Sequence, residues 1–251
     1  MNVTVIISVL NGEATIGRAL QSIASQDAPI FEIIIVNDGS TDKTKSIVES
    51  WANSLPITLL NNPENIGVAP SRSISMHASS GDIVFVLDAD DSWEPDHVST
   101  ILKMAEKNPK AVLFSTRAHY RNQDGELTSV SPHNSDATIR TELMWDNPLV
   151  HSSMAFLRET YFLTEGYSTK YTWDDYFLWI QILRHGQLAA SPKTTVNYFE
   201  YANSLSRIKK KHSLDSRFRL QTLAIKSFAR QHPLPAIKNL AIVTIRKLVK
   251  R

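Results

Sequence analysis

The first hundred residues alternate two patterns of apolar side chains. Short continuous runs rich in β-branched residues are typical of buried strands, and the segments between them repeat apolar residues at helical spacing, as Ile16, Leu20 and Ile23 do. The predicted strands are Val3–Val9, Phe31–Val36, Ile57–Leu60 and Ile83–Leu87. The predicted helices are one that Asn11 caps, Lys43–Trp51, one from Asn65 or Gly67 to Ala78, and one from Pro95 to Glu106. This order predicts an α/β fold with a doubly wound, mostly parallel central sheet flanked by helices.

The alternation loosens after a further apolar run at Ala111–Arg117. Residues 118–140 are polar, with Asp124-Gly125 as a predicted hairpin turn. The later predicted elements are Thr141–Trp145, Met154–Leu157, Tyr176–Arg184, a helix over Leu214–Arg230, a break at Pro233 and Pro235, and a helix over Ala236–Lys250. We therefore expect one domain over residues 1–205, with halves 1–117 and 118–205, and a helical C-terminal extension over residues 206–251.

Composition narrows the class of protein. A chain of 251 residues with 42% hydrophobic residues can bury the core of one large α/β domain. It has no cysteine, which excludes disulfides and thiolate metal sites. The apolar start lacks a basic region, so we expect no signal peptide, and no apolar run approaches the roughly 20 residues of a membrane span. We expect a cytoplasmic protein.

Charge divides the chain unevenly. Residues 206–251 hold 13 of the 27 Lys and Arg residues and one acidic residue, Asp215, for a net charge of +12. The remaining residues, 1–205, carry −10. A basic segment on an acidic body predicts an anionic partner, either phosphate or a membrane surface.

Two parts of the basic segment are candidates for that contact. Lys209, Lys210 and Lys211 either form a solvated linker or fold over a diphosphate. On a helical wheel the final stretch places most of its apolar residues on one arc and its basic residues, except Lys238, opposite. The arc consists of Ile237, Leu240, Ala241, Ile242, Ile245, Leu248 and Val249. Such a helix either packs on the core or lies in an anionic membrane interface.

Polar residues gather where the predicted strands end. Asn11 follows the first strand, Asp38 the second, and Asp88, Asp90 and Asp91 the fourth. Ligands of such sheets bind at the carboxyl ends of the strands. Carboxylates packed this closely repel, and Mg²⁺ or Mn²⁺ would hold them ionised, although a solvated turn before the next helix is the simpler alternative. Asp38 has a similar alternative, as part of a turn in which Thr41 or Asp42 caps the next helix.

The order of these motifs resembles that of the family 2 glycosyltransferases, which have the GT-A fold, over about residues 1–205. The matching segments are Ile7-Ser8-Val9-Leu10-Asn11-Gly12, Asn37-Asp38-Gly39-Ser40-Thr41-Asp42, Asn65-Ile66-Gly67 with Arg72-Ser73, Asp88-Ala89-Asp90-Asp91, and Asp174-Asp175-Tyr176-Phe177-Leu178-Trp179. Four positions depart from the family pattern: Asn37 and Asp174 replace an aspartate and a glutamate, Ser73 an asparagine, and Phe177 an aspartate. The loss of a carboxylate at Phe177 puts any acceptor role of that position in doubt.

The resemblance implies a role for each donor-side residue. Ser8, Val9, Asn11 and Asp38 would contact the nucleoside of a nucleotide sugar, with a UDP-sugar expected. Arg72 would lie near the base or the phosphates. Asp88 and Asp91 would share the ribose and the cation, with Asp90 as the first metal ligand and Mn²⁺ or Mg²⁺ as the cofactor.

On the acceptor side, the resemblance implies that Asp175 is the general base. Inverting transfer needs a carboxylate that takes the proton of the attacking hydroxyl, and the neighbouring Asp174 would raise the pKa of Asp175 by repulsion. The alternative is that both residues only cap the helix that follows. His151 is either a contact for acceptor or phosphate, as Asp174 and the three lysines also could be, or a structural hydrogen-bonding residue.

The sequence thus predicts an inverting, metal-dependent glycosyltransferase that extends a glycan or a lipid-linked oligosaccharide in surface polysaccharide synthesis. The resemblance also implies that the protein acts at the cytoplasmic face of a membrane. A nucleotidyltransferase would need a Gly-rich, basic loop after the first strand, which Ser8–Gly12 lacks. Binding of nucleic acid by the basic segment is not expected, since Phe218 and Phe228 are essentially its only aromatic residues and the acidic body would repel phosphates.

Overall fold

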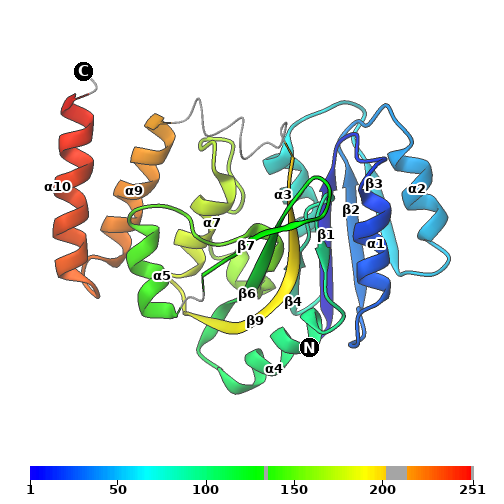
Figure 1. Ribbon diagram of the computed structural model, residues 1–251, viewed down its shortest axis with the longest axis horizontal. Helices are drawn as coiled ribbons and strands as arrows, with labels where there is room; N and C mark the ends of the chain where they lie inside the picture. Colours follow the sequence, from blue (N-terminus) through cyan, green and yellow to red (C-terminus); the bar gives the residue numbers. More distant parts are fainter. Residues whose placement is uncertain (133–134, 202–213, 250–251) are drawn as a thin grey trace.

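A computed structural model describes residues 1–132, 135–201 and 214–249. Within them, nine strands form one curled sheet in the order β3-β2-β1-β4-β8-β6-β9-β5, with β7 paired to β6 (Figure 1). The strands are β1 Val3–Val9, β2 Glu32–Asn37, β3 Ile57–Asn61, β4 Ile83–Val86, β5 Ser92–Trp93, β6 Ala111–Asn122, β7 Leu127–Val130, β8 Met154–Leu157 and β9 Gln187–Glu200. The predicted α/β architecture is confirmed.

The helices of the first half cover both faces of the sheet. Strands β3, β2, β1 and β4 are parallel. Ile7 of β1 packs in the same core cluster as Leu20 of α1, whereas its neighbour Ile6 packs in the cluster of Met76 of α3. Both faces of β1 are therefore buried, which explains its uninterrupted apolar sequence. These helices are α1 Ile16–Ala24, α2 Thr44–Trp51, α3 Val68–Ala78 and α4 His97–Lys107.

The second half adds one reversed strand between strands that keep the direction of the first half. Strand β8 is antiparallel to both β4 and β6, and β9 runs parallel to β6 over its length. The 14-residue β9 was not among the predicted strands, and β6 continues to Asn122, into the segment read as a polar excursion. The turn at Asp124-Gly125 does join β6 to β7, with Gly125 at φ +86. The remaining helices are α5 Asp136–Leu143, η1 His151–Ser153, α6 Arg158–Tyr161, α7 Asp174–Ile182, α9 Leu214–Phe228 and α10 Pro233–Val249.

The described part of the C-terminal extension packs on the second half. Phe218, Leu220 and Phe228 of α9 lie in one core cluster with residues of α5 and α7. Helix α10 packs on α9 at the edge of the molecule (Figure 1). It begins at Pro233, so both prolines lie in its first turn rather than in a break before Ala236, because a proline there loses no helical hydrogen bond. No helix among the described residues is long and apolar enough to cross a membrane.

Candidate active site

The first two strand-end loops are tied together at the carboxyl edge of the sheet. Asn11 does not cap α1, whose N-cap is Thr15. Asn11 instead has φ 51, and its Oδ1 accepts a hydrogen bond from the backbone N–H of Thr41 at 2.9 Å. The carbonyl of Val9 accepts from the N–H of Asp38 at 2.8 Å, and the buried Oγ of Ser8 has no hydrogen-bond partner among the described residues. Ser8 therefore offers a polar atom that a bound ligand could satisfy.

Asp38 is 4% exposed and holds the segment that leads into α3. Its Oδ1 accepts from Nδ2 of Asn62 at 2.8 Å and from the N–H of Ile66 at 3.0 Å, and its Oδ2 accepts from the N–H of Gly67 at 2.9 Å. The adjoining Gly39 approaches the backbone of Glu64 so closely that a Cβ would lie 2.5 Å from the carbonyl carbon. The Asp-Gly pair thus fixes two loops against each other.

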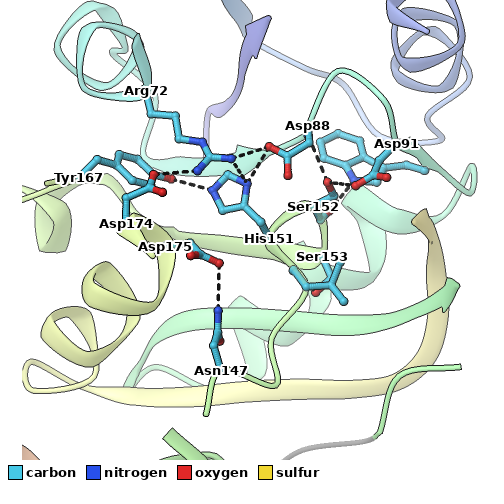
Figure 2. A network of polar contacts seen from close by, with 12 residues as sticks. Arg72, Asp88, Asp91, Asn147, His151, Ser152, Ser153, Tyr167, Asp174 and Asp175 are labelled. Carbon is cyan, nitrogen blue, oxygen red and sulfur yellow. Dashed lines mark hydrogen bonds and ion pairs between the residues drawn. The ribbon is translucent and has the colours of Figure 1, made fainter. Parts of the chain in front are cut away.

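Arg72, from α3, lies at the centre of a buried polar network (Figure 2). Its guanidinium donates to Asp88 Oδ1 at 2.7 Å and to Asp174 Oδ2 at 2.8 Å. The Nδ1 of His151 lies 3.0 Å from Asp88 Oδ1 and 3.1 Å from the guanidinium, and its Nε2 lies 3.2 Å from the hydroxyl of Tyr167. Arg72 therefore joins the loop after β4 to the start of α7.

The three aspartates after β4 differ in the direction in which their surroundings shift their pKa values. Burial alone would raise the pKa of Asp88, but the charges of His151 and Arg72 outweigh it and hold that pKa well below its usual range. Burial, followed by the charges of its two neighbours, raises the pKa of Asp91 well above the usual range. Asp91 is fully buried, and it accepts hydrogen bonds from the Oγ of Ser152 and, at 3.0 Å, from the N–H of Phe199.

Asp90 is partly buried, as Asp88 is, but it has no hydrogen bond from Arg72. Burial and the charge of Asp88 raise its pKa to about 6. Arg18 of α1 donates to the backbone carbonyl of Asp90 at 2.5 Å, and its guanidinium lies 3.7 Å from the centre of the Phe199 ring. The Asp90 side chain therefore projects from a loop whose backbone is held on two sides.

A divalent cation fits the Asp90 carboxylate, because a hard cation would offset the repulsion from Asp88 that disfavours its ionised form. Throughout the described ranges, no group of three or more His, Asp or Glu side chains is placed to hold a metal by itself. Such a cation would need further oxygen ligands from phosphates and water, which is how Mg²⁺ is usually bound.

Asp174 and Asp175 occupy the first turn of α7, whose N-cap is Trp173. Asp174 is 2% exposed and paired to Arg72, whereas Asp175 is half-buried and accepts from Nδ2 of Asn147 at 2.9 Å (Figure 2). Burial and then the charge of Asp174 raise the pKa of Asp175. A half-buried carboxylate with a raised pKa can accept a proton from a bound hydroxyl.

The structure thus brings together Arg72, Asp88, His151, Asp174 and Asp175, which the sequence had placed in separate motifs. It adds partners that the sequence analysis had not named: Arg18, Asn147, Ser152 and Tyr167. Asn147 and Ser152 lie close to His151 in the sequence, whereas nothing in the sequence pointed to Tyr167. Phe177, which replaces a family aspartate, stacks on Tyr171 with ring centres 4.5 Å apart. Lys209, Lys210 and Lys211 lie outside the described residues.

The curled α/β sheet flanked by helices is the GT-A fold of glycosyltransferases. The chain belongs to glycosyl transferase family 2, whose family model matches residues 4–164.

Related proteins agree with this membership. The chain is 29% identical over 231 residues to the E. coli UDP-Glc:alpha-D-GlcNAc-diphosphoundecaprenol beta-1,3-glucosyltransferase WfaP, covering 91% of this chain and 89% of that protein. It is 25% identical over 187 residues to an E. coli UDP-Gal:alpha-D-GlcNAc-diphosphoundecaprenol beta-1,3-galactosyltransferase, covering 74% of this chain and 68% of the relative. It is also 26% identical over 226 residues to an uncharacterized glycosyltransferase of Haemophilus influenzae, covering 82% of this chain and 68% of that protein.

Solved structures share the fold. S. aureus TarS 1-349 in complex with UDP-GlcNAc superposes with a TM-score of 0.73 at 17% identity, covering 91% of this chain and 67% of that TarS chain. The Pyrobaculum calidifontis mannosyltransferase PcManGT, in complex with GDP-Man and Mn²⁺, superposes with a TM-score of 0.67 at 22% identity, covering 98% and 80%.

Proposed function

We propose that this glycosyltransferase is inverting and metal-dependent, and that it moves a hexosyl or N-acetylhexosaminyl group from a UDP-sugar to a hydroxyl of a diphospholipid-linked glycan in bacterial surface polysaccharide synthesis. The observation that carries the proposal is the Arg72 network, which joins the donor-side Asp88 directly to the Asp174–Asp175 pair. The names of two E. coli relatives, which specify UDP-sugar donors and GlcNAc-diphosphoundecaprenol acceptors, support the substrate classes.

On the donor side, the loops of Ser8, Val9, Asn11 and Asp38 bind the nucleoside, and Asp88 faces the ribose. Asp90 is the metal ligand, and Asp91 holds its loop through Ser152 and Phe199. A bound Mn²⁺ or Mg²⁺ would neutralise charge on the departing diphosphate. Arg72 places a fixed positive charge beside the same strand end.

On the acceptor side, Asp175 takes the proton of the acceptor hydroxyl as that oxygen bonds to the anomeric carbon. The bond from this carbon to the diphosphate oxygen breaks at the same time, and the electron pair leaves with the nucleoside diphosphate. Attack from the side opposite the leaving group inverts the configuration. His151, Asp174 and the lysines at 209–211 are the proposed contacts for acceptor or diphosphate, His151 and Asp174 acting through the Arg72 network.

The donor proposal is tested by the thermal stability of the protein with a panel of nucleotide sugars, with and without Mn²⁺. We expect a UDP-sugar to raise the Tm only when the cation is present. A shift of equal size in the presence of a chelator would contradict the metal requirement.

Helix α10 supports the proposal that the enzyme lies on an anionic membrane, at its cytoplasmic face. It packs through Ala236 and Val243, whereas Leu234 and Ile237 are 80% and 67% exposed. The C-terminal segment 206–251 also carries 13 basic residues and one acidic residue. Exposed apolar side chains on a basic segment are typical of helices that bind anionic lipid surfaces.

We expect the double variant Leu234→Ser/Ile237→Ser to bind vesicles containing phosphatidylglycerol about tenfold more weakly than the parent, or weaker still, because it loses two exposed apolar side chains that would enter the lipid. Co-sedimentation measures this. Leu163→Ser is the matched control, since Leu163 is 65% exposed but lies far from α10 along the chain. Unchanged binding of the double variant, or equal binding to neutral vesicles, would contradict the membrane proposal.

A further inference from the structure

The carboxylate of Asp175 has a neutral partner that no motif contains. Nδ2 of Asn147 donates to Asp175 Oδ2 at 2.9 Å (Figure 2). Oδ1 of Asn147 accepts from the backbone N–H of Leu149 at 3.2 Å. An N–H group can only donate, so this bond fixes which end of the amide faces Asp175. The amide therefore presents a donor to the carboxylate.

Helix α9 holds both chain segments that meet at this bond. Arg217 pairs with Asp146 at 2.6 Å, and Gln221 donates to the carbonyl of Trp145, so the two residues before Asn147 are anchored. On the other side, the N–H of Thr172 donates to the Oγ of Ser216 at 2.9 Å, three residues before Asp175. Side chains from two successive turns of one helix thus set the distance between Asn147 and Asp175, and such support is what keeps a reactive group in a fixed orientation.

We propose that Asn147 is a positioning residue for the general base: it binds Oδ2 of Asp175 and thereby directs Oδ1 to the acceptor hydroxyl. This inference rests on the proposed role of Asp175 as the base. The proton passes from the acceptor oxygen to Oδ1, and the Asn147 amide neither gains nor loses a proton. A donor on Oδ2 also stabilises the ionised form that can accept this proton.

The charged groups that face Asp175 are Asp174 on its own helix, His151 of η1 and Arg72 of α3. Asp146, the residue before Asn147, pairs with Arg217 of α9, so these two charges offset each other. Asn147 is neutral and donates, so a carboxylate in its place removes a favourable bond and adds a like charge. The ionised form of Asp175 then becomes less stable, and deprotonation needs a higher pH.

The test is the pH dependence of kcat/KM for sugar transfer, from the UDP-sugar that the nucleotide panel selects to a synthetic GlcNAc-diphospholipid. We expect Asn147→Asp to move the acid limb of the profile upward by about one pH unit or more. Its kcat at neutral pH should fall about tenfold or more, and the KM of the donor should stay within about twofold. Asn147→Ala should lower kcat to a similar extent with a smaller shift of the acid limb, so it tests the proposal even where the aspartate variant folds poorly.

Asn122→Asp is the matched control, because Nδ2 of Asn122 donates to Glu126 Oε2 at 2.9 Å in the exposed β6–β7 hairpin. It should leave the profile and kcat unchanged. If both Asn147 variants kept the pH profile and kcat of the parent while Asp175→Asn was inactive, the positioning role of Asn147 would be overturned. The role of Asp175 as the base would stand. An active Asp175→Asn would instead overturn the proposed function on which this inference depends.

Discussion

Asp175→Asn should lower the rate of sugar transfer by about 10²- to 10⁴-fold, because it removes the carboxylate that we propose takes the acceptor proton. The amide has nearly the same shape, and its oxygen can still accept from Asn147, so the start of α7 should keep its structure. Binding of the nucleotide sugar should therefore change by no more than about twofold. Radiolabelled transfer to the diphospholipid acceptor measures the first effect, and calorimetry with the donor measures the second.

Asp124→Asn is the control for this substitution, since Asp124 lies in the exposed hairpin after β6. It should transfer sugar at the parent rate. If Asp175→Asn lost donor binding instead of transfer, Asp175 would belong to the nucleotide side of the site and another group would be the base.

Arg72→Met should lower the free energy of unfolding by about 3–5 kcal/mol, because it leaves the buried carboxylate of Asp174 and the partly buried carboxylate of Asp88 without their cation. Urea denaturation at neutral pH measures this. The deficit should shrink in acid, since the pKa of Asp88 is depressed in the folded parent. Its contribution is present above the unfolded pKa and is lost as the pH falls through the folded one.

Arg158→Met is the matched control. Arg158 is half-buried, and its Nε donates to the hydroxyl of Ser79. Its replacement should lower the free energy of unfolding by only about 1 kcal/mol. The double variant Arg72→Met/Asp174→Asn should recover part of the loss, because it removes one uncompensated charge. An Arg72→Met loss no larger than that of Arg158→Met would show that the network does not hold the two halves together.

The parallel half of the fold was predictable because β1, β2 and β4 are buried on both faces, and the edge strand β3 still has a short run of apolar residues. Val3–Val9 agrees with the predicted strand residue for residue, and the other three strands of this half differ by one residue at one or both ends. Local patterns of this kind place the carboxyl ends of β1, β2 and β4 at one edge of the sheet. That edge is where the loops of Asn11, Asp38 and Asp88 lie.

The long strand β9 was not predicted, because its pairing depends on partners far away in the sequence. The bounds of β8 agree with the predicted element Met154–Leu157, but its reversed direction depends on such distant partners too. Only six of the 14 residues of β9 are buried, so its sequence lacks an uninterrupted apolar run. Asn11 shows the same limit locally. Its residue type suits a helix cap, but the Thr41 N–H of the neighbouring loop binds its side chain.

The candidate site was predictable as a set of residues but not as a set of contacts. Arg72 and Asp174 are 102 positions apart, and their pairing depends on how α7 folds back against α3. Asp88, Asp90 and Asp91 are nearly equivalent in the sequence. Only their burial and partners separate a carboxylate paired to Arg72, a half-buried one and one bonded inside the protein. Asn147 could not be selected at all, because its function depends on the orientation of one amide.

The most direct test of the proposed metal-dependent donor site is the rise in Tm that UDP-sugars cause with and without Mn²⁺, in the parent and in Asp90→Asn. At a donor concentration of about 100 times Kd, binding should add about 2.7 kcal/mol, which corresponds to a rise of about 5 °C or more. Asp82→Asn, at the opposite end of β4, should behave as the parent. The account predicts that the rise needs Mn²⁺ and disappears in Asp90→Asn. A rise that persists without metal, or that survives in Asp90→Asn, would contradict it.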